Sequence, residues 1–337
     1  MKKQSEKKVC ILGSGAWGTV IGSLLADGGR EVVIYGRSKG VVGEMNSIHK
    51  NTKYLGDGFV INEKVRATLS LEEGVKKAKI IVLAVPSFAI KETAKRLYGI
   101  IEKDAVIVNL SKGFDKESGK TLGETLRENL PKECRKNVVS LLGPSFAEEV
   151  AKKQYTAITA SAKNEKIARE IQEIFSNEYF RVYTNSDTVG TEYCSSLKNV
   201  IALASGIADG LGYKANTRAA LITRGMAEIV RFVRHFGGRE ETCFGLAGIG
   251  DLILTCSSKT SRNYTAGYVI GSTGIENFKR VNDKTVEGIY AVEIAYNVAK
   301  EVGVYAPIIS AVYNVVYRGA NPMEEIKELM IGKLKKE

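Results

Sequence analysis

A glycine-rich turn near the amino terminus constrains the fold of this chain more than any other feature. A short apolar run leads into Gly13-Ser-Gly15-Ala-Trp-Gly18, which is followed by an apolar segment with helical spacing that ends at Gly28. A second apolar run, Glu-Val-Val-Ile-Tyr, then ends at Tyr35. Strand, glycine turn, helix and strand within about thirty residues are typical of a βαβ unit.

Each glycine of this turn has a mechanical role. Gly13 allows the tight turn, Gly15 lets the backbone approach a pyrophosphate, and Gly18 lets helix and strand pack closely. The pyrophosphate would lie on the free amides at the positive end of the helix. A glycine turn alone is weak evidence, but a strand on each side of it predicts a dinucleotide-binding Rossmann unit.

The end of the second strand bears on which dinucleotide binds. An NAD-selective site usually places Asp or Glu about 20 residues after the glycines, where it binds the ribose 2′-hydroxyl. Here that carboxylate is missing and Arg37 takes its place. A guanidinium can pair with a 2′-phosphate, so we expect NADPH to be accepted as well as NADH. The alternative is that Arg37 is a solvent-facing loop residue.

Strands and helices alternate after this unit. Continuous apolar runs, typical of parallel strands buried on both faces, predict strands at Lys79–Val85, Ala105–Leu110 and Val138–Leu142. These runs end in Pro-Ser, Ser-Lys-Gly and Gly-Pro-Ser. Because ligands in open α/β sheets bind beyond the carboxyl ends of strands, the three turns point to one crevice.

The character of the sequence changes near residue 186. Before it, strands are predicted at Thr156–Ala160 and Phe180–Thr184, with a helix at Asn164–Phe175 between them. After it, apolar residues follow the spacing of a buried helical face from Leu197 to Leu211. Further helices are predicted at Thr217–His235, Thr285–Val302, Ile308–Tyr317 and from Pro322.

This pattern predicts the α/β class with two domains. Residues 1–186 should form a Rossmann-type, doubly wound, mostly parallel sheet that binds the dinucleotide. Residues 187–337 should form an all-helical domain that carries the substrate site and the catalytic groups.

The charge and the cysteines argue against a nucleic-acid-binding protein, a disulfide-rich fold and a cysteine metal site. The net charge is +11, but dense basic clusters occur only at the termini, at Met1–Lys8 and Lys333–Lys336. Solvated tails on a protein that binds a phosphorylated ligand explain this distribution of positive charge better than nucleic-acid binding does. The five cysteines are odd in number and widely spaced, with no metal-ligand pair and no disulfide framework.

The amino-terminal apolar run is interrupted by glycines, which argues against a secretory signal. No apolar stretch approaches the roughly 18–20 residues that span a bilayer. We therefore expect a cytoplasmic protein with no membrane insertion and no bound metal.

One lysine stands out as a group for proton transfer. Reduction of a carbonyl by hydride needs a donor for the developing alkoxide. The two histidines do not fit, because His49 follows the second helix of the nucleotide fold and His235 lies at the carboxyl end of a helix. Lys198 is the only Lys or Arg between Arg181 and Lys214, in an apolar helix where desolvation would lower its pKa. The alternative is a lysine that snorkels from a helix edge.

Two later segments carry polar groups that could hold the lysine or bind a phosphate. Gly245–Leu252 is glycine-rich and is predicted to be a mobile loop that delivers one carboxylate, Asp251, to hold or tune a lysine. Ser257–Asn263 concentrates hydroxyls, two cations and an amide, as a phosphate site requires. The alternative for this second loop is a polar surface turn.

Several motifs occur together in the order found in one enzyme family. They are Gly13–Gly18 with Trp17, Ser111–Gly113, Gly143–Ala147, Leu197–Val200, Asn216–Gly225, Gly248–Leu252, Ser261–Asn263 and Val286–Gly288. Together they resemble the soluble bacterial type of NAD(P)-dependent glycerol-3-phosphate dehydrogenase, from about Val9 to Pro322. The chain departs from the family pattern at Cys194-Ser195-Ser196, where many members carry Gly-Gly-Ala.

The resemblance implies reversible hydride transfer between NAD(P)H and dihydroxyacetone phosphate, giving sn-glycerol 3-phosphate for phospholipid synthesis. It implies that Lys198 is the proton donor and acceptor, with Lys112 and Asp251 beside the substrate. Further substrate contacts that it implies are Gly143, Ser145, Ser261, Arg262 and Asn263. The cofactor contacts that it implies, besides the glycines, are Ala16, Trp17, Arg37, Lys112, Ala147, Arg262, Val286 and Glu287.

Two other readings compete with this one. A related dehydrogenase with a Rossmann and an all-helical domain, acting on a hydroxy acid, would not need the Ser-Arg-Asn segment to hold a phosphate. A non-catalytic NAD(P)H sensor would tolerate the loss of Lys198 and would usually carry a recognisable interaction segment. The partner that we expect is a small phosphorylated substrate, and a homodimer is the assembly that we consider.

Overall fold

The computed structural model describes residues 7–283 and 285–331, so Lys2, Lys3 and the basic cluster Lys333–Lys336 lie outside the described residues. The chain forms two compact units. The first consists of Met1–Ser111 with Leu122–Thr188, and the second consists of Lys112–Thr121 with Val189–Glu337.

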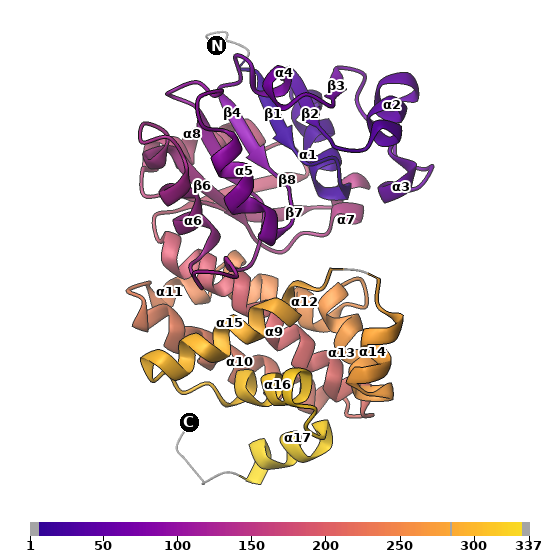
Figure 1. The fold of residues 1–337 in the computed structure, drawn as a ribbon, viewed down its shortest axis with the longest axis vertical. Helices are drawn as coiled ribbons and strands as arrows, with labels where there is room; N and C mark the ends of the chain where they lie inside the picture. Colours follow the sequence, from indigo (N-terminus) through magenta and orange to yellow (C-terminus); the bar gives the residue numbers. More distant parts are fainter. Residues whose placement is uncertain (1–6, 284, 332–337) are drawn as a thin grey trace. The chain divides into compact units, whose positions relative to one another are not determined.

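The first unit is built on one eight-stranded sheet in the order β3-β2-β1-β4-β5-β6-β7-β8 (Figure 1). Neighbouring strands are parallel except for the antiparallel pair β6 and β7. The chain order reverses between β1 and β4, the switch point where such sheets bind ligands. The strands are β1 Val9–Leu12, β2 Val32–Tyr35, β3 Val65–Thr68, β4 Ile80–Leu83, β5 Val106–Asn109, β6 Val138–Leu142, β7 Thr156–Ser161 and β8 Phe180–Asn185.

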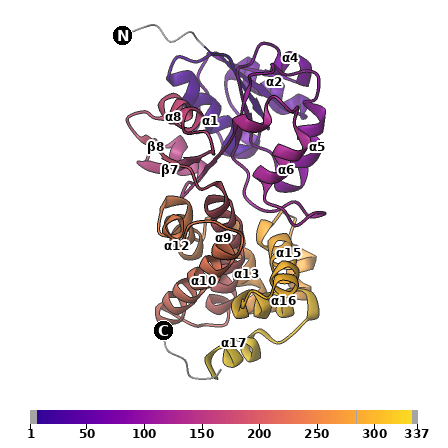
Figure 2. The same cartoon turned by 90° about the vertical axis from the view of Figure 1, so that its left-hand side faces the viewer.

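Helices cover both faces of this sheet (Figure 2). Alternate residues of a strand point to opposite faces, so Val9 and Ile11 pack with α1 and α8, whereas Cys10 and Leu12 pack with α5 and α6. The helices are α1 Ala16–Asp27, α2 Lys39–Ile48, α3 Thr52–Leu55, α4 Leu71–Val75, α5 Ile90–Arg96, α6 Leu122–Asn129, α7 Ala147–Ala151 and α8 Glu165–Phe175.

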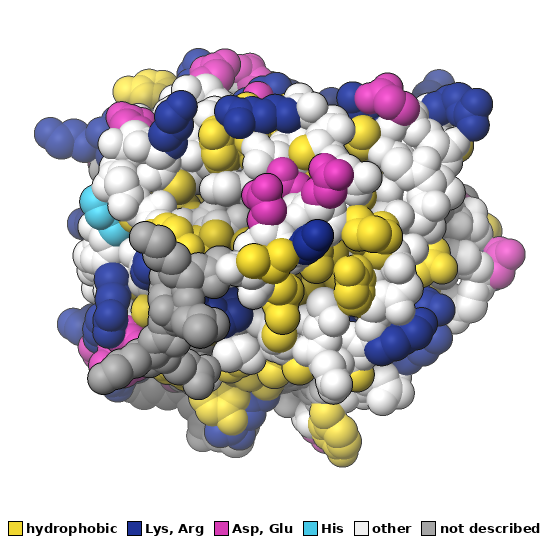
Figure 3. Space-filling model, turned by 90° about the horizontal axis from the view of Figure 1, so that it is seen from below, with side chains coloured by type: hydrophobic (Ala, Val, Ile, Leu, Met, Phe, Trp, Pro, Cys, Tyr) yellow, Lys and Arg dark blue, Asp and Glu magenta, His cyan; other side chains and the backbone are white. Residues whose placement is uncertain are grey.

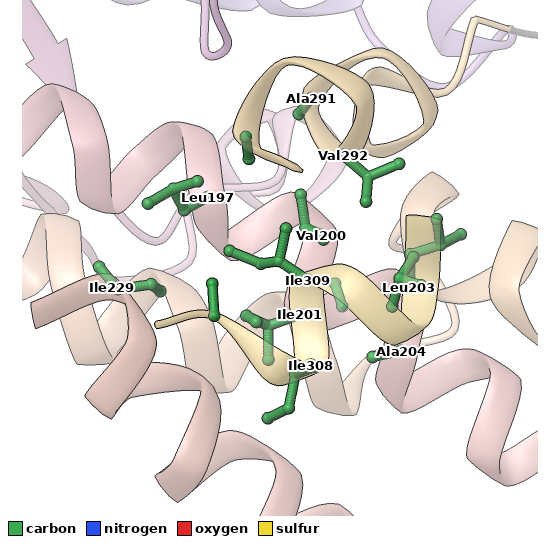
Figure 4. Packing of buried hydrophobic residues seen from close by; sticks show 14 of the residues in the cluster. Leu197, Val200, Ile201, Leu203, Ala204, Ile229, Ala291, Val292, Ile308 and Ile309 are labelled. Carbon is green, nitrogen blue, oxygen red and sulfur yellow. The ribbon is translucent and has the colours of Figure 1, made fainter. Parts of the chain in front are cut away.

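The second unit is helical and is organised around α9, Thr188–Gly210. Leu197, Val200 and Ile201 of α9 lie in its core with Ile229 of α10 and Ile309 of α16 (Figure 4). The remaining helices are α10 Ala215–His235, α11 Glu240–Cys243, α12 Asp251–Ser257, α13 Arg262–Thr273, α14 Ile275–Val281, α15 Glu287–Val302, α16 Pro307–Arg318 and α17 Pro322–Ile331. None of the described helices is long and apolar enough to cross a membrane.

The predicted fold class, a doubly wound and mostly parallel sheet followed by an all-helical region, is confirmed. Gly245–Leu252 was predicted as a mobile loop, and this was wrong. Leu246–Gly250 forms a helical turn with a kink at Gly248, whose φ of −95° and ψ of −106° are not helical, and it leads directly into α12. The backbone is so close here that a Cβ on Gly248 would lie 2.1 Å from the Cys243 carbonyl oxygen.

The division into units also differs from a single boundary at residue 186. Lys112–Thr121 groups with the helical unit because Phe114 is buried in the helical core. Lys112 therefore belongs to the same compact unit as Lys198 and Asp251.

Candidate functional site

The glycine turn has the geometry that a bound pyrophosphate requires. Gly13 has a φ of +124°, and a Cβ there would lie 2.3 Å from the Ala84 carbonyl oxygen. A Cβ on Gly18 would lie 2.1 Å from the Gly13 carbonyl oxygen, so neither position accepts a side chain. A Cβ on Gly15, by contrast, would meet no atom within 4 Å. The turn thus leaves open space beside Gly15, at the amino end of α1, where helix amides attract an anion.

The other predicted residues of the first unit follow strand ends. Arg37 is exposed just after β2, and Ala16 is the first residue of α1. The Trp17 ring lies 6.5 Å, centroid to centroid, from the Phe180 ring. The Trp17 side chain is therefore engaged in packing.

Gly143, Ser145 and Ala147 follow β6. The Ser145 hydroxyl donates to the Gly143 carbonyl oxygen at 3.2 Å. Because β1, β2 and β6 run in the same direction, these residues, the glycine turn and Arg37 lie at the carboxyl edge of the sheet.

The second unit contains a buried cluster of two lysines and one carboxylate. The Lys198 ammonium donates to Asp251 Oδ1 at 2.8 Å and to Thr255 Oγ1 at 2.6 Å. The Lys112 ammonium donates to Asp251 Oδ2 at 2.7 Å. Lys198 and Asp251 are 5% and 1% exposed, whereas the Lys112 side chain is 21% exposed. The structure thus brings together the three residues predicted to be catalytic.

Burial and the neighbouring charges shift the pKa values of Lys198 and Asp251. Burial lowers the pKa of Lys198 to about 8, although Asp251 favours its charged form and Lys112 opposes it. Burial alone would raise the pKa of Asp251, but Lys112 and Lys198 together lower it. One carboxylate shared by two ammonium groups stays ionised, and burial makes Lys198 release its proton more readily than an ordinary lysine does.

Local structure fixes each member of the cluster. Asp251 begins α12 and Thr255 lies one turn later on the same face. The Thr255 hydroxyl donates to the Asp251 carbonyl oxygen at 2.6 Å, so its lone pair is available to Lys198. Thr255 was not predicted, and the only signal for it in the sequence is its i, i+4 spacing from Asp251.

Lys112 is held by its neighbour. The Gly113 N–H donates to Ser196 Oγ at 3.2 Å, and the Gly113 carbonyl oxygen lies 2.8 Å from the same oxygen. Ser196 is one of the residues at which the chain departs from the family pattern. In this chain its hydroxyl ties the Lys112 segment to α9.

The predicted phosphate segment is not a loop throughout, because Arg262 begins α13. Ser261 caps this 12-residue helix by accepting from the Tyr264 N–H at 3.2 Å. Arg262 is exposed, and one of its guanidinium nitrogens donates to the Thr285 carbonyl oxygen at 3.2 Å. A cation beside the positive end of a helix suits a phosphate.

Asn263 is largely committed to the protein itself. Its Nδ2 donates to Asn199 Oδ1 at 2.8 Å, and its Oδ1 accepts from the Gly288 N–H at 2.8 Å. These bonds bring Ser261–Asn263 next to Val286 and Glu287, and Asn199 adjoins Lys198 in α9. The second unit therefore carries a candidate proton-transfer cluster, Lys198–Asp251–Lys112, and a candidate anion-binding helix end at Ser261 and Arg262. The two are connected through Asn199.

A hollow of about 1130 Å³ opens elsewhere in the first unit. It is lined by both acidic and basic residues, among them Lys7, Lys79, Asp104 and Glu170. It lies at the amino ends of the strands, opposite the edge where open α/β sheets bind ligands. We assign it no part in the site. The described residues hold no group of three or more His, Cys, Asp or Glu that could bind a metal ion.

A glycine turn at the switch point of a doubly wound sheet and a buried lysine in a helical unit define a two-domain, NAD(P)-dependent oxidoreductase. Residues 8–168 match the family described as NAD-dependent glycerol-3-phosphate dehydrogenase N-terminus, and residues 187–327 match the corresponding C-terminus. The chain belongs to this family.

Relatives and solved structures agree with this membership. The chain is 42% identical over 327 residues to glycerol-3-phosphate dehydrogenase [NAD(P)+] of Bacillus velezensis, covering 96% of this chain and 94% of that protein. It is 43% identical to the Clostridium acetobutylicum enzyme of the same name, covering 98% of each. A crystal structure of glycerol-3-phosphate dehydrogenase from Coxiella burnetii matches with a TM-score of 0.90 and 32% identity, covering 97% of this chain and 99% of that one.

A more distant neighbour bears on the competing hydroxy-acid reading. A ketopantoate reductase from Ralstonia eutropha matches with a TM-score of 0.62 and 18% identity, covering 96% of this chain and 99% of that one. This likeness shows the fold alone.

Proposed function

We propose that this chain transfers hydride reversibly between NAD(P)H and dihydroxyacetone phosphate, giving sn-glycerol 3-phosphate, with Lys198 as the proton donor and acceptor. The observation that carries the proposal is the buried Lys198–Asp251–Lys112 cluster. It offers an acid whose pKa of about 8 lies near the working range of an enzyme. An enzyme of this family supplies the glycerol phosphate backbone of phospholipids.

Each residue of the cluster has its own role in the transfer of the proton. As hydride reaches the carbonyl carbon, negative charge grows on the carbonyl oxygen, and the Lys198 ammonium donates a proton to it. Asp251 stays ionised and holds the ammonium, while Thr255 fixes its direction. Lys112 adds positive charge beside the developing alkoxide. In the reverse direction, neutral Lys198 takes the proton from the alcohol.

The first unit fits a dinucleotide. The open space beside Gly15 and the amino end of α1 suit a pyrophosphate, with Gly13, Gly18, Ala16 and Trp17 forming the turn around it. Bound NADPH or NADH supplies the hydride. The exposed Arg37 is available to a 2′-phosphate. Lys112, Ala147, Arg262, Val286 and Glu287 are the remaining proposed cofactor contacts.

The anion-binding helix end favours a phosphorylated substrate over a hydroxy acid. Ser261 and Arg262 stand at the positive end of α13, and the Arg262 guanidinium can bind phosphate in a bidentate manner. Asn263 keeps one amide hydrogen beyond its bond to Asn199. Gly143 and Ser145 are the substrate contacts that we assign to the first unit.

We also propose that the enzyme acts in the cytoplasm and as a homodimer. The five cysteines, all within the described residues, are buried and form no disulfide, which fits a reducing compartment. Hydrophobic side chains that a partner subunit could cover are exposed on one face of the helical unit (Figure 3). Helix α17 has no buried residue and exposes Met323 and Met330. Sedimentation of the purified chain would test the dimer.

The activity is tested by following nicotinamide absorbance with dihydroxyacetone phosphate and, in parallel, with ketopantoate as a representative of the hydroxy-acid reductases. We expect rapid oxidation of NADPH or NADH with the phosphorylated substrate alone. Turnover of ketopantoate in its place would favour the hydroxy-acid reading. Cofactor binding without turnover of either substrate would favour a sensor.

A further inference from the structure

We propose that Asn51 is a positioning residue that aims the pyrophosphate-binding amides of the glycine turn, an inference that rests on the dinucleotide binding proposed above. Asn51 is fully buried between α2 and α3, 37 positions beyond Ser14. Its Nδ2 donates to the Ser14 carbonyl oxygen at 3.0 Å and to Thr19 Oγ1 at 2.8 Å. No motif of the sequence singles it out.

Thr19 extends the contact to the next peptide group. Its Oγ1 donates to the Gly15 carbonyl oxygen at 2.8 Å. The Gly15 carbonyl oxygen also accepts from the Thr19 N–H at 3.0 Å, in the first turn of α1. Two successive carbonyl groups of the turn, those of Ser14 and Gly15, thus both contact one buried pair of side chains. We call this pair, Asn51 and Thr19, the carbonyl clamp.

The clamp determines where the adjoining N–H groups point. In a trans peptide the C=O and N–H bonds point in opposite directions, and none of the described peptide bonds is cis. A Ser14 carbonyl held toward Asn51 therefore directs the Gly15 N–H away from it, and the Gly15 carbonyl does the same for the Ala16 N–H. These are the amides beside the open space at Gly15.

The side chain of Asn51 is not needed to cap its own helix. Asn51 occupies the position before α3, where asparagine commonly accepts from a backbone N–H. Here it makes no such bond, and the Glu44 carboxylate accepts from the Thr52 N–H at 3.2 and 3.3 Å instead. The Asn51 amide group is therefore free to contact the glycine turn.

The remaining atom of the amide argues against a role in packing alone. Asn51 Oδ1 is buried and has no hydrogen-bond partner among the described residues. A buried oxygen without a donor opposes folding, so an apolar residue would suit a purely structural position better. The two bonds from Nδ2 are what an asparagine contributes here.

The test replaces Asn51 by leucine, which has a similar size and no donor. Asn51→Leu should raise the Kd for NADPH about tenfold, the effect of one well-placed hydrogen bond. It should leave kcat at saturating cofactor within about twofold. Binding of adenosine 2′-phosphate, which has no pyrophosphate, should not change.

Asn137→Leu is the matched control. Asn137 is also buried, and its Nδ2 lies 3.4 Å from the carbonyl oxygens of Asp104 and Ala105, before β5. It should lower stability without changing the Kd for NADPH. If Asn51→Leu does not fold, Thr19→Val breaks the clamp from its other side, and Thr19→Ser should restore tight binding.

The outcomes separate this inference from the function on which it rests. A wild-type chain that binds neither NADPH nor NADH overturns the proposed function and this inference together. A wild-type chain that binds NADPH, with an unchanged Kd in Asn51→Leu or in Thr19→Val, overturns the carbonyl clamp alone. Equal weakening of NADPH and adenosine 2′-phosphate would show that Asn51 only supports the fold.

Discussion

The two units provide their functional groups in different ways. The first presents backbone amides at the end of a helix, in a turn where Gly13 and Gly18 leave no room for side chains and Gly15 leaves the space open. The second presents charged side chains in a dry interior, with one carboxylate between two ammonium groups. Backbone amides suit a ligand whose charge never changes, whereas a proton must be moved by a titratable side chain.

The two units also differ in the desolvation cost of their functional groups. The glycine turn, Gly13–Gly18, buries no charged side chain of its own. The cluster in the second unit buries Lys198 and Asp251, and the cost of desolvating these charges is offset by the hydrogen bonds that they make with each other, with Lys112 and with Thr255. We therefore expect substitutions at Lys198 or Asp251 to change chemistry with little effect on cofactor binding, and those at Arg37 or Asn51 to do the reverse.

The largest effect is expected for Lys198→Met, which keeps much of the stem and removes the proton and the charge. Positioned acid catalysis contributes about 10²–10⁴-fold, and electrostatic stabilisation of the alkoxide adds to it. We expect kcat to fall at least about a thousandfold while the Kd for NADPH stays near that of the wild type. A variant that keeps more than about a tenth of wild-type kcat would move the assignment to Lys112.

Arg262→Ala tests the anion-binding helix end. Loss of a charged hydrogen bond costs about 1.5–3 kcal/mol, so kcat/KM for dihydroxyacetone phosphate should fall at least about tenfold. Steady-state kinetics at saturating NADPH measures this. Arg318→Ala is a suitable control, because Arg318 is an exposed arginine of the same unit that stacks on Tyr296 and Tyr313. Unchanged kinetics in Arg262→Ala would remove this helix end from the substrate site.

A smaller effect, confined to one cofactor, is expected in the first unit. Arg37→Ala should raise the KM for NADPH several-fold, by roughly the value of an exposed charged contact, and leave that for NADH almost unchanged. Comparison of the two cofactors in one preparation is the internal control. Equal effects on both would show that Arg37 does not contact the 2′-phosphate.

Glu228 is another buried carboxylate of the second unit, and its pKa can be compared with that of Asp251. Its buried carboxylate accepts from the Ile308 and Ile309 N–H groups at 2.6 and 3.1 Å. Unlike Asp251, it forms no ion pair with a lysine within residues 7–283 and 285–331, and the charges that act on it from a distance are those of Arg231 and Arg224. Burial raises the pKa of Glu228 to about 7, although the two amides oppose the shift.

The folded state therefore holds the Glu228 proton more tightly than the unfolded state. Its contribution to stability is complete below the unfolded pKa near 4.5 and is lost as the pH rises through about 7. Glu228→Gln should remove this dependence, so its Tm relative to wild type should rise by a few degrees from about pH 5 to 8. A constant difference in Tm would contradict the assignment.

The two units also differ in how far the sequence predicts them. The glycine turn is local, so Gly13–Gly18 with its flanking strands was enough to place the Rossmann unit. The predicted strands at Val138–Leu142 and Phe180–Thr184 end within one residue of the observed β6 and β8. By contrast β3, with only four residues and an exposed Arg66, gave no signal.

The cluster in the second unit depends on long-range contacts. Lys198 was singled out because it is a lone cation in an apolar helix. The contacts that Asp251 makes with Lys112 and Lys198 span 139 and 53 positions of the chain. No local pattern encodes them. Thr255 and Ser196 were missed for the same reason, since a threonine or a serine in a helix becomes informative only when its partner is known.

The central claim is that the buried Lys198 exchanges the proton of the reaction. The most direct test is the single-turnover rate of hydride transfer, measured in both directions from about pH 6 to 10. Reduction needs the charged lysine and oxidation needs the neutral one. The rate of reduction should therefore fall, and that of oxidation should rise, through a common pKa of about 8. A common titration near 10.5, the ordinary value for lysine, or rates that do not change with pH would contradict the account.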